Sequence, residues 1–272
     1  MYSEYWKLTA RPFRNTPDPK FYYNSAQHDE ALTKMAYAVN ENIGGAILTG
    51  AYGCGKTLLA RILFQELGDS FIAKACFAQP DMMPVDLLRG IARSITGDEL
   101  PAERSNIMPD ALLEIIEKAL RENHRDGKHT VVLVDEAHML DNPPSLEMLR
   151  LLLNLQSGDE FLLTLLLIGH IELAERVGAL KQLAQRIPLA CSLKQFVAAE
   201  TAKYIAYRLA IAGGGEQIFD DDALNVIHRN SGGIPRRINT LCEISLLLGS
   251  HRNVRKINAS LVLEAAEKFG AA

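Results

Sequence analysis

A glycine-rich run that ends in lysine and threonine carries the clearest chemistry in this sequence. Its spacing fits the pattern G-x-x-x-x-G-K-[ST], and it lies between a short apolar strand and the start of a helix. Glycines let the backbone curl so that its N–H groups point at phosphate oxygens, and the helix N-terminus adds partial positive charge. A chance glycine turn would not need these flanking elements, so we predict a phosphate-binding loop. Its residues are Gly50, Ala51, Tyr52, Gly53, Cys54, Gly55, Lys56, Thr57 and Leu58.

Two side chains of this loop have expected roles of their own. Lys56 is expected to reach the β and γ phosphates of a nucleotide, and the hydroxyl of Thr57 to bind Mg2+. Cys54 is expected to serve only as a small residue of the loop.

An acidic pair, Asp135 and Glu136, follows an apolar strand over residues 131–134. The carboxyl ends of parallel strands form the edge of an α/β sheet at which ligands bind. We therefore expect Asp135 to hold Mg2+, directly or through water, and Glu136 to polarise the attacking water. The alternative is a pair that merely caps the next helix, and the preceding phosphate-binding loop favours the catalytic interpretation.

Residues 135–138 also spell Asp-Glu-Ala-His, the box of superfamily 2 helicases. Those motors need a second RecA-like domain with its own arginine motif, and the helical tail after residue 195 cannot be that domain. His138 is therefore expected to start a helix, with a signalling role as the alternative.

Strands and helices alternate over the first two-thirds of the chain, which predicts an α/β fold with a parallel sheet covered on both faces. Pro188 in the fifth strand places that strand at an edge. The expected strands are residues 46–49, 71–77, 130–134, 162–168 and 187–191. The expected helices between them are residues 27–42, 57–67, 84–94, 109–123, 145–156 and 171–184.

After Lys194 only helical patterns remain, over residues 198–212, 220–230, 235–250 and 258–269. We therefore divide the chain into three parts. Residues 1–45 form an N-terminal arm and entry helix that belong to the nucleotide pocket, residues 46–195 the α/β core, and residues 196–272 a helical lid.

The composition is that of a globular protein, with 272 residues, 48% hydrophobic and 23% charged. This length is too short for two full motor domains in tandem. The net charge of -4 excludes binding to nucleic acid or membranes through bulk positive charge. Residues 229–256 do hold six basic residues against the single acid Glu243, for which a solvated helical face with one functional arginine is the simpler explanation.

The four cysteines are far apart in the sequence, so neither a zinc site nor a disulfide framework is expected. The N-terminus lacks the apolar stretch of a signal peptide, and the longest strongly apolar run, residues 161–169, is far below the ~20 residues of a membrane helix. These features predict a cytoplasmic protein with no transmembrane segment of its own.

Several motifs together resemble the AAA+ ATPases of the ExeA type (general secretion pathway protein A). This family is similar to the TnsC-like transposition ATPases and, more distantly, to origin-recognition ATPases. The resemblance covers nearly the whole chain and implies a P-loop core of three layers with a five-stranded parallel sheet, followed by a small all-α lid. It rests on Pro12, Phe13, residues 16–19, Ser25, His28, residues 30–32, the phosphate-binding loop, residues 135–138, 168–169, 172–173, 183–187 and 231–239.

The resemblance implies two further catalytic residues. His170 stands where AAA+ proteins place the polar sensor 1 residue beside Glu136, although the family usually has Gln-Pro at the positions of His170 and Ile171. A histidine that only caps a helix is the alternative. Arg186 stands where related ATPases present an arginine finger to the neighbouring subunit, against the alternative of a surface salt bridge, and Arg150 is a weaker candidate.

The resemblance also implies contacts with the nucleotide from the ends of the chain. Pro235 would start a lid helix, and Arg236 after it would be the sensor 2 arginine that points at the nucleotide, whereas Arg237 faces solvent. The entry segment would lie over the adenine, and the choice between its candidates stays open. They are Phe13, Thr16 and His28.

The expected activity is that of an ATPase, which converts ATP and water to ADP and phosphate with Mg2+ at a subunit interface. The resemblance implies a homo-oligomeric ring or filament that acts as a switch in assembly of a secretion or pilus-type envelope machine. Such a protein would be cytoplasmic and reach the inner membrane through a protein partner. The alternative is an ATP-dependent regulator bound to duplex DNA, like the transposition ATPases. A module that only binds nucleotide is disfavoured, because Glu136 and Arg186 are both present.

Overall fold

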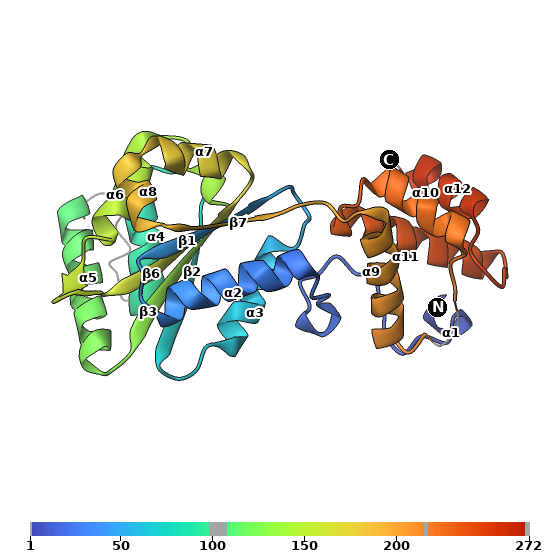
Figure 1. Ribbon diagram of the computed structural model, residues 1–272, viewed down its shortest axis with the longest axis horizontal. Helices are drawn as coiled ribbons and strands as arrows, with labels where there is room; N and C mark the ends of the chain where they lie inside the picture. The colour runs from blue at the N-terminus through green and yellow to red at the C-terminus, as the bar shows by residue number, and fades with distance from the viewer. Residues whose placement is uncertain (1, 98–107, 215–216, 270–272) are drawn as a thin grey trace. The chain divides into compact units, whose positions relative to one another are not determined.

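The computed structural model describes residues 2–97, 108–214 and 217–269 (Figure 1). Contacts divide the chain into two compact units, which we call the sheet unit and the helical unit. The sheet unit comprises Gln27–Gly50 and Leu59–Leu193. The helical unit comprises the N-terminal residues through Ala26, the segment Ala51–Leu58, and the chain from Lys194 onward.

A five-stranded parallel sheet forms the centre of the sheet unit, in the order β2-β3-β6-β1-β7. The predicted fold class is therefore confirmed. The fifth predicted strand does lie at an edge, but Pro188 precedes it rather than lying within it. The strands are β1 (Gly45–Gly50), β2 (Phe71–Phe77), β3 (His129–Asp135), β6 (Leu163–Gly169) and β7 (Leu189–Leu193).

The sheet has two covered faces because its central strands are apolar at successive positions. One face, with Ile47, Val132 and Leu165 among its side chains, forms a core with five helices. They are α4 (Pro84–Thr96), α5 (Pro109–Arg125), α6 (Pro143–Leu152), α7 (Glu172–Ala179) and α8 (Lys181–Arg186). Figure 1 shows α2 (Ala26–Asn40) and α3 (Lys56–Glu66) over the opposite face.

Two predicted helices differ from the observed ones. The segment expected as one helix over residues 171–184 forms α7 and α8, because Leu180 leaves the helical region with φ −96° and ψ 83°. The helix expected over residues 145–156 starts earlier, at Pro143 after the N-cap Asn142, and ends at Leu152. Beyond it the chain forms a short hairpin of β4 (Gln156–Ser157) and β5 (Glu160–Phe161), which hydrophobic periodicity did not reveal.

The helical unit packs the N-terminal arm against the C-terminal helices. Trp6 Nε1 donates a buried hydrogen bond to the carbonyl of Leu246 at 2.9 Å. Phe13 is 1% exposed and meets Phe219 edge to face, with ring centroids 6.3 Å apart. The elements of the unit are α1 (Tyr2–Tyr5), η1 (Pro19–Phe21), α9 (Ala198–Ile211), α10 (Asp221–Ser231), α11 (Pro235–His251) and α12 (Ala259–Phe269).

A buried arginine on α9 binds this N-terminal arm. Arg208 donates to the carbonyl of Pro12 at 2.5 Å and to the hydroxyl of Tyr204 at 2.6 Å. Its guanidinium carbon lies 5.1 Å from the centroid of the Phe21 ring. These contacts stabilise a cation that would be costly to bury alone.

In the ranges that the structure describes, no helix is both long and apolar enough to cross a membrane.

His129 at the start of β3 should make the stability of the fold depend on pH. Burial, together with the charge of His124, lowers the pKa of His129 from 6.5 to about 4. Between these values the unfolded chain takes up a proton at this residue that the folded protein does not bind, so the free energy of unfolding falls as the pH drops from 6.5 to 4. Replacing His129 by glutamine, which can still bond to Thr164, should reduce this loss by about 2 kcal/mol after allowance for partial exposure.

Urea unfolding at pH 7 and pH 4.5, followed by circular dichroism, measures this difference. The same replacement at the exposed His251 controls for the removal of one imidazole from the chain. If His129→Gln lost as much stability on acidification as the wild-type protein, His129 would have to be protonated in the folded state as readily as in the unfolded one.

Candidate functional site

The glycine-rich loop joins the end of β1 at Gly50 to the start of α3 at Lys56. Gly53 and Gly55 have φ angles of 84° and 98°, in the region that residues with a Cβ atom rarely adopt. The two glycines therefore make the curled path possible. A loop of this shape before a helix N-terminus fits a phosphate group, because its N–H groups and the helix dipole favour negative charge.

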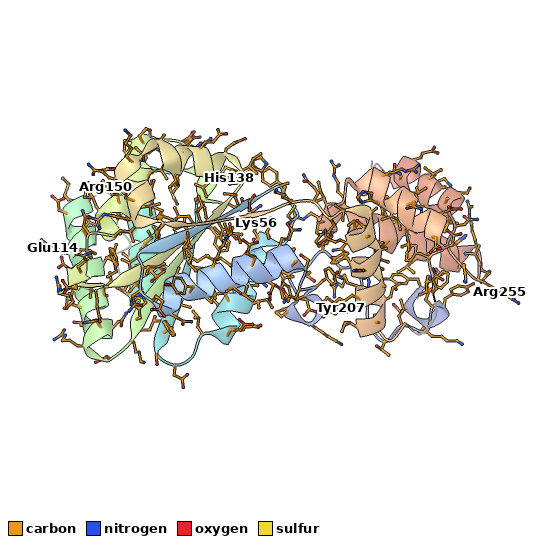
Figure 2. The ribbon with its side chains drawn as sticks, viewed as in Figure 1. Lys56, Glu114, His138, Arg150, Tyr207 and Arg255 are labelled. Carbon is orange, nitrogen blue, oxygen red and sulfur yellow. The ribbon has the colours of Figure 1, made fainter. Side chains whose placement is uncertain are left out.

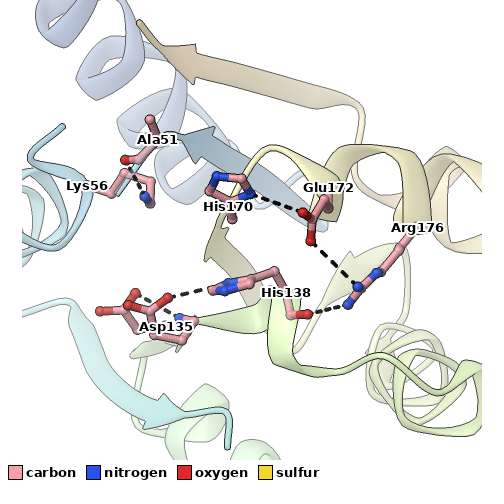
Figure 3. A network of polar contacts seen from close by, with 8 residues as sticks. Ala51, Lys56, Asp135, His138, His170, Glu172 and Arg176 are labelled. Atoms are coloured by element: carbon pink, nitrogen blue, oxygen red, sulfur yellow. Dashed lines mark hydrogen bonds and ion pairs between the residues drawn. The ribbon is translucent and has the colours of Figure 1, made fainter. Parts of the chain in front are cut away.

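The lysine of the loop is turned back onto the loop itself. Lys56 is 8% exposed, its Nζ donates to the carbonyl of Ala51 at 3.1 Å (Figure 3), and it lies 5.8 Å from the centroid of the Tyr52 ring. Cys54 is buried, and burial raises the pKa of its thiol, so it serves as a small packing residue. The loop thus binds its own lysine ammonium, and Thr57 follows directly as the first-turn hydroxyl of α3.

The N-terminus of α11 lies against this loop within the helical unit. The N–H of Arg236 donates to the carbonyl of Gly53 at 3.2 Å. A Cβ atom added to Gly53 would lie 2.6 Å from the Cβ of Arg236 and 3.2 Å from Cγ2 of Ile234. The structure therefore brings the expected sensor 2 arginine next to the phosphate-binding loop, and only glycine at position 53 permits this approach. Arg236 and Arg237 are both exposed.

In the sheet unit, the acidic pair stands at the carboxyl end of β3. Asp135 is 3% exposed, and its Oδ1 accepts a hydrogen bond from the N–H of Glu136 at 2.9 Å. Glu136 itself has φ 54° and ψ 31°, a left-handed conformation that costs ~1 to 3 kcal/mol and is common at functional sites. A buried carboxylate oxygen is a ligand that Mg2+ prefers, so Asp135 fits the expected metal role.

One histidine lies beside Glu136, and a second histidine and an ion pair lie next to the first histidine. Nδ1 of His138 lies 3.4 Å from Oε2 of Glu136. Nδ1 of His170, just after β6, lies 3.5 Å from Oε1 of Glu172, and the two imidazole rings are 6.0 Å apart. Arg176 closes the group by donating to the carbonyl of His138 and lying 3.7 Å from Glu172 (Figure 3). The structure thus brings His138 and His170 together at the end of the sheet.

The sequence prediction named no role for Glu172 or Arg176 in this group. A signal was present, because they are four residues apart on α7, the spacing at which opposite charges meet on a helix. The sensor 1 role of His170 stays a prediction. The carbonyl of His170 accepts the N–H of Leu173 at the start of α7, while its ring faces the acid Glu172.

The two arginine-finger candidates bind within their own chain. Arg186 is the last residue of α8, and its Nη1 donates to the carbonyl of Leu153 at 2.7 Å. Arg150 on α6, which is labelled in Figure 2, is paired with Glu147 at 2.5 Å. A role for Arg186 in a neighbouring subunit stays a prediction.

The comparison with protein families settles which kind of protein this is. The AAA domain family matches residues 40–177, a stretch that contains the phosphate-binding loop and the acidic pair. The chain belongs to the AAA domain family. General secretion pathway protein A of Aeromonas hydrophila is 38% identical over 274 residues, covering 99% of this chain and 49% of that protein. The resemblance to the ExeA type is thereby confirmed, and this chain spans about half the length of the relative.

Solved structures support the same fold at low sequence identity. Cdc6p of Pyrobaculum aerophilum has a TM-score of 0.70 and 18% identity, covering 98% of this AAA chain and 70% of its own. The ORC1 protein of Aeropyrum pernix, solved in complex with DNA, has a TM-score of 0.70 and 16% identity, with coverages of 96% and 70%. At such identities the likeness concerns the fold alone.

Proposed function

We propose that this AAA protein binds and hydrolyses ATP with Mg2+ and acts as an oligomeric switch in the assembly of a secretion or pilus-type envelope machine. The observation that carries the catalytic part is the strained, histidine-flanked Glu136 directly after the buried Asp135. The relation to general secretion pathway protein A over 99% of the chain supports the role in an envelope machine. Work at the inner membrane would then go through a protein partner.

The proposed reaction is transfer of the γ-phosphoryl group from ATP to water. Lys56 binds the β and γ phosphates, since its ammonium is already held within the loop. Glu136 polarises the attacking water, with His170 as the further group expected to hold that water. Arg236 stabilises charge on the phosphates from the start of α11. Positioning and charge stabilisation supply nearly all of such catalysis.

The residues expected to hold Mg2+ fit that ion by their chemistry. Thr57 offers a hydroxyl in the first turn of α3, and Asp135 offers a buried carboxylate at the end of β3. When bound, the ion would neutralise charge that develops on the phosphate oxygens.

Hydrolysis is proposed to require two subunits, because Arg186 acts on the nucleotide of a neighbour. The test mixes two defective proteins. Glu136→Gln lacks the base but keeps its arginine, and Arg186→Ala lacks the arginine but keeps its base. An equimolar mixture should hydrolyse ATP at least about threefold faster than the sum of the two alone, since mixed interfaces restore one complete site, and a finger contributes ~10³ to 10⁵ in rate.

Phosphate release at several protein concentrations measures this, and the specific activity of the wild-type protein should rise with concentration. A mixture with Arg150→Ala in place of Arg186→Ala is the matched control. If the mixture hydrolyses ATP only at the summed rate of the two separate proteins, Arg186 is excluded as a finger in trans. Absence of any hydrolysis by the wild-type protein would refute the enzymatic proposal as a whole.

A role on duplex DNA is the second candidate function. It is favoured by the fold shared with a protein solved in complex with DNA, and by the exposed Arg255 and Lys256. Arg252 in the same segment is paired with Glu264 at 2.5 Å, which lowers the local positive charge. Adding duplex DNA to the same assay separates the candidates. Stimulation that disappears steeply with added salt would favour the DNA role, because counterion release drives such binding.

A further inference from the structure

His138 is a side chain held in place from several directions. A Cβ atom on Gly169 would lie 3.0 Å from the backbone nitrogen of His138 and 3.3 Å from its Cβ, so β6 and the segment after β3 are in close contact there. The carbonyl of His138 accepts a hydrogen bond from Arg176. The residue is only 5% exposed, which leaves the imidazole little room to rotate.

This fixed ring faces the residue expected to act on water. Its Nδ1 lies 3.4 Å from Oε2 of Glu136, whose own side chain is 43% exposed. Glu136 therefore has a rigid neighbour on one carboxylate oxygen. A long, half-exposed glutamate side chain otherwise has considerable rotamer freedom, and this freedom would have to be lost before each reaction.

We propose that His138 is a positioning residue, which holds one carboxylate oxygen of Glu136 so that the other oxygen faces the attacking water. The inference rests on the proposed ATPase function and deepens it. In the structure the two atoms lie 3.4 Å apart without a hydrogen bond between them. In the tautomer that carries its proton on Nδ1, a small rotation of the Glu136 side chain would let the imidazole donate to Oε2, which restricts the carboxylate to one orientation. Misplacement of a catalytic group by ~1 Å can cost about 10²-fold in rate. Loss of the positioning by His138 is therefore expected to lower kcat.

Arg176 and Glu172 extend this arrangement onto α7. Arg176 fixes the backbone of His138 and is itself close to Glu172, which in turn faces His170. The orientation of Glu136 is thus linked to the helix that begins at the expected sensor 1 position.

Two substitutions of His138 separate positioning from packing. In His138→Asn, the amide nitrogen is the same number of bonds from Cα as Nδ1, so it can still donate to Glu136. In His138→Leu, a side chain of similar size keeps the core filled but has no donor. We expect His138→Leu to lower kcat for ATP hydrolysis by about 10-fold to 10²-fold with KM within about twofold, and His138→Asn to restore kcat to within about threefold of wild type.

The full chain is assayed by phosphate release, with thermal unfolding as the check on folding. Wild-type kcat in His138→Leu, or a folded His138→Asn that is as slow as His138→Leu, would overturn the proposal. If His138→Leu does not fold, Arg176→Met carries the test, because it removes the hydrogen bond to the His138 carbonyl, together with the ion pair to Glu172, from a partly exposed side chain. It should lower kcat about threefold or more, whereas Lys181→Met, an exposed charge on α8, should not.

These results are distinguishable from failure of the proposed function. No hydrolysis by the wild-type protein would refute the ATPase proposal itself. Hydrolysis that depends on Glu136 but proceeds at the same rate with and without the His138 imidazole would leave the ATPase proposal standing and refute only the role of His138.

Discussion

Replacing Glu136 by glutamine is expected to slow ATP hydrolysis by at least about 10²-fold while the protein still binds ATP. Glutamine has nearly the shape of glutamate but cannot accept the proton of the attacking water. The hydrogen bond to Asp135 comes from the backbone N–H of residue 136, so the buried carboxylate keeps this contact in the variant. The loss should therefore lie in kcat, with nucleotide affinity within about threefold of wild type.

Single-turnover hydrolysis and titration with a fluorescent ATP analogue measure the two quantities separately. Glu175→Gln, which removes an exposed carboxylate on α7, is the matched control and should behave as wild type. A Glu136→Gln protein with the wild-type rate would show that another group activates the water, and the assignment of the base would then be wrong.

The parts of this protein that sequence could predict are those in which chemistry and local structure share one short segment. The glycine loop is followed at once by the helix that it needs, and the apolar residues 131–134 lead straight into Asp135. The backbone conformation of such a segment is determined locally, because it involves only the end of one strand and the turn that follows it. The parallel sheet followed from the alternation of strands and helices, and the edge position of the fifth strand was likewise predicted, whereas the order of the strands was not.

Contacts between distant segments were beyond sequence reasoning. The sequence predicts no role for Arg208, yet it binds the carbonyl of Pro12, 196 positions away. Phe13 was a candidate for the adenine, and the structure places it in the core of the helical unit against Phe219. A local contact was missed as well, because Glu136 lies 3.4 Å from the ring of His138 and has a left-handed backbone, which sequence patterns do not reveal in a residue other than glycine.

Another such contact gives the second large expected effect, at the turn between α10 and α11. Gly232 and Gly233 both have positive φ angles, of 59° and 71°. A Cβ atom on Gly232 would meet nothing within 4 Å, whereas one on Gly233 would lie 2.0 Å from the carbonyl oxygen of Phe196. The two adjacent glycines thus share a backbone conformation but differ in the space around them.

Gly232→Ala should lower the free energy of unfolding by only about 1 kcal/mol, the usual cost of a side chain in the left-handed region. Gly233→Ala should lower it by about 3 kcal/mol or more, because the backbone at Phe196 would have to move and the hydrogen bond from its N–H to the carbonyl of Gly233 would be strained. Urea unfolding measures both losses. Equal losses would mean that the turn shifts freely and that the close approach to Phe196 is not required.

The same pair of variants tests whether the turn positions the nucleotide site. Two residues after Gly233, Pro235 begins α11, and Arg236 then contacts Gly53 of the phosphate-binding loop. A displaced turn should therefore move Arg236 and weaken binding of an ATP analogue by about tenfold or more in Gly233→Ala, which corresponds to ~1.4 kcal/mol. Gly232→Ala should bind as wild type. Unchanged affinity in a destabilised Gly233→Ala would show that the loop holds the nucleotide without help from α11, and the sensor 2 role of Arg236 would then be refuted.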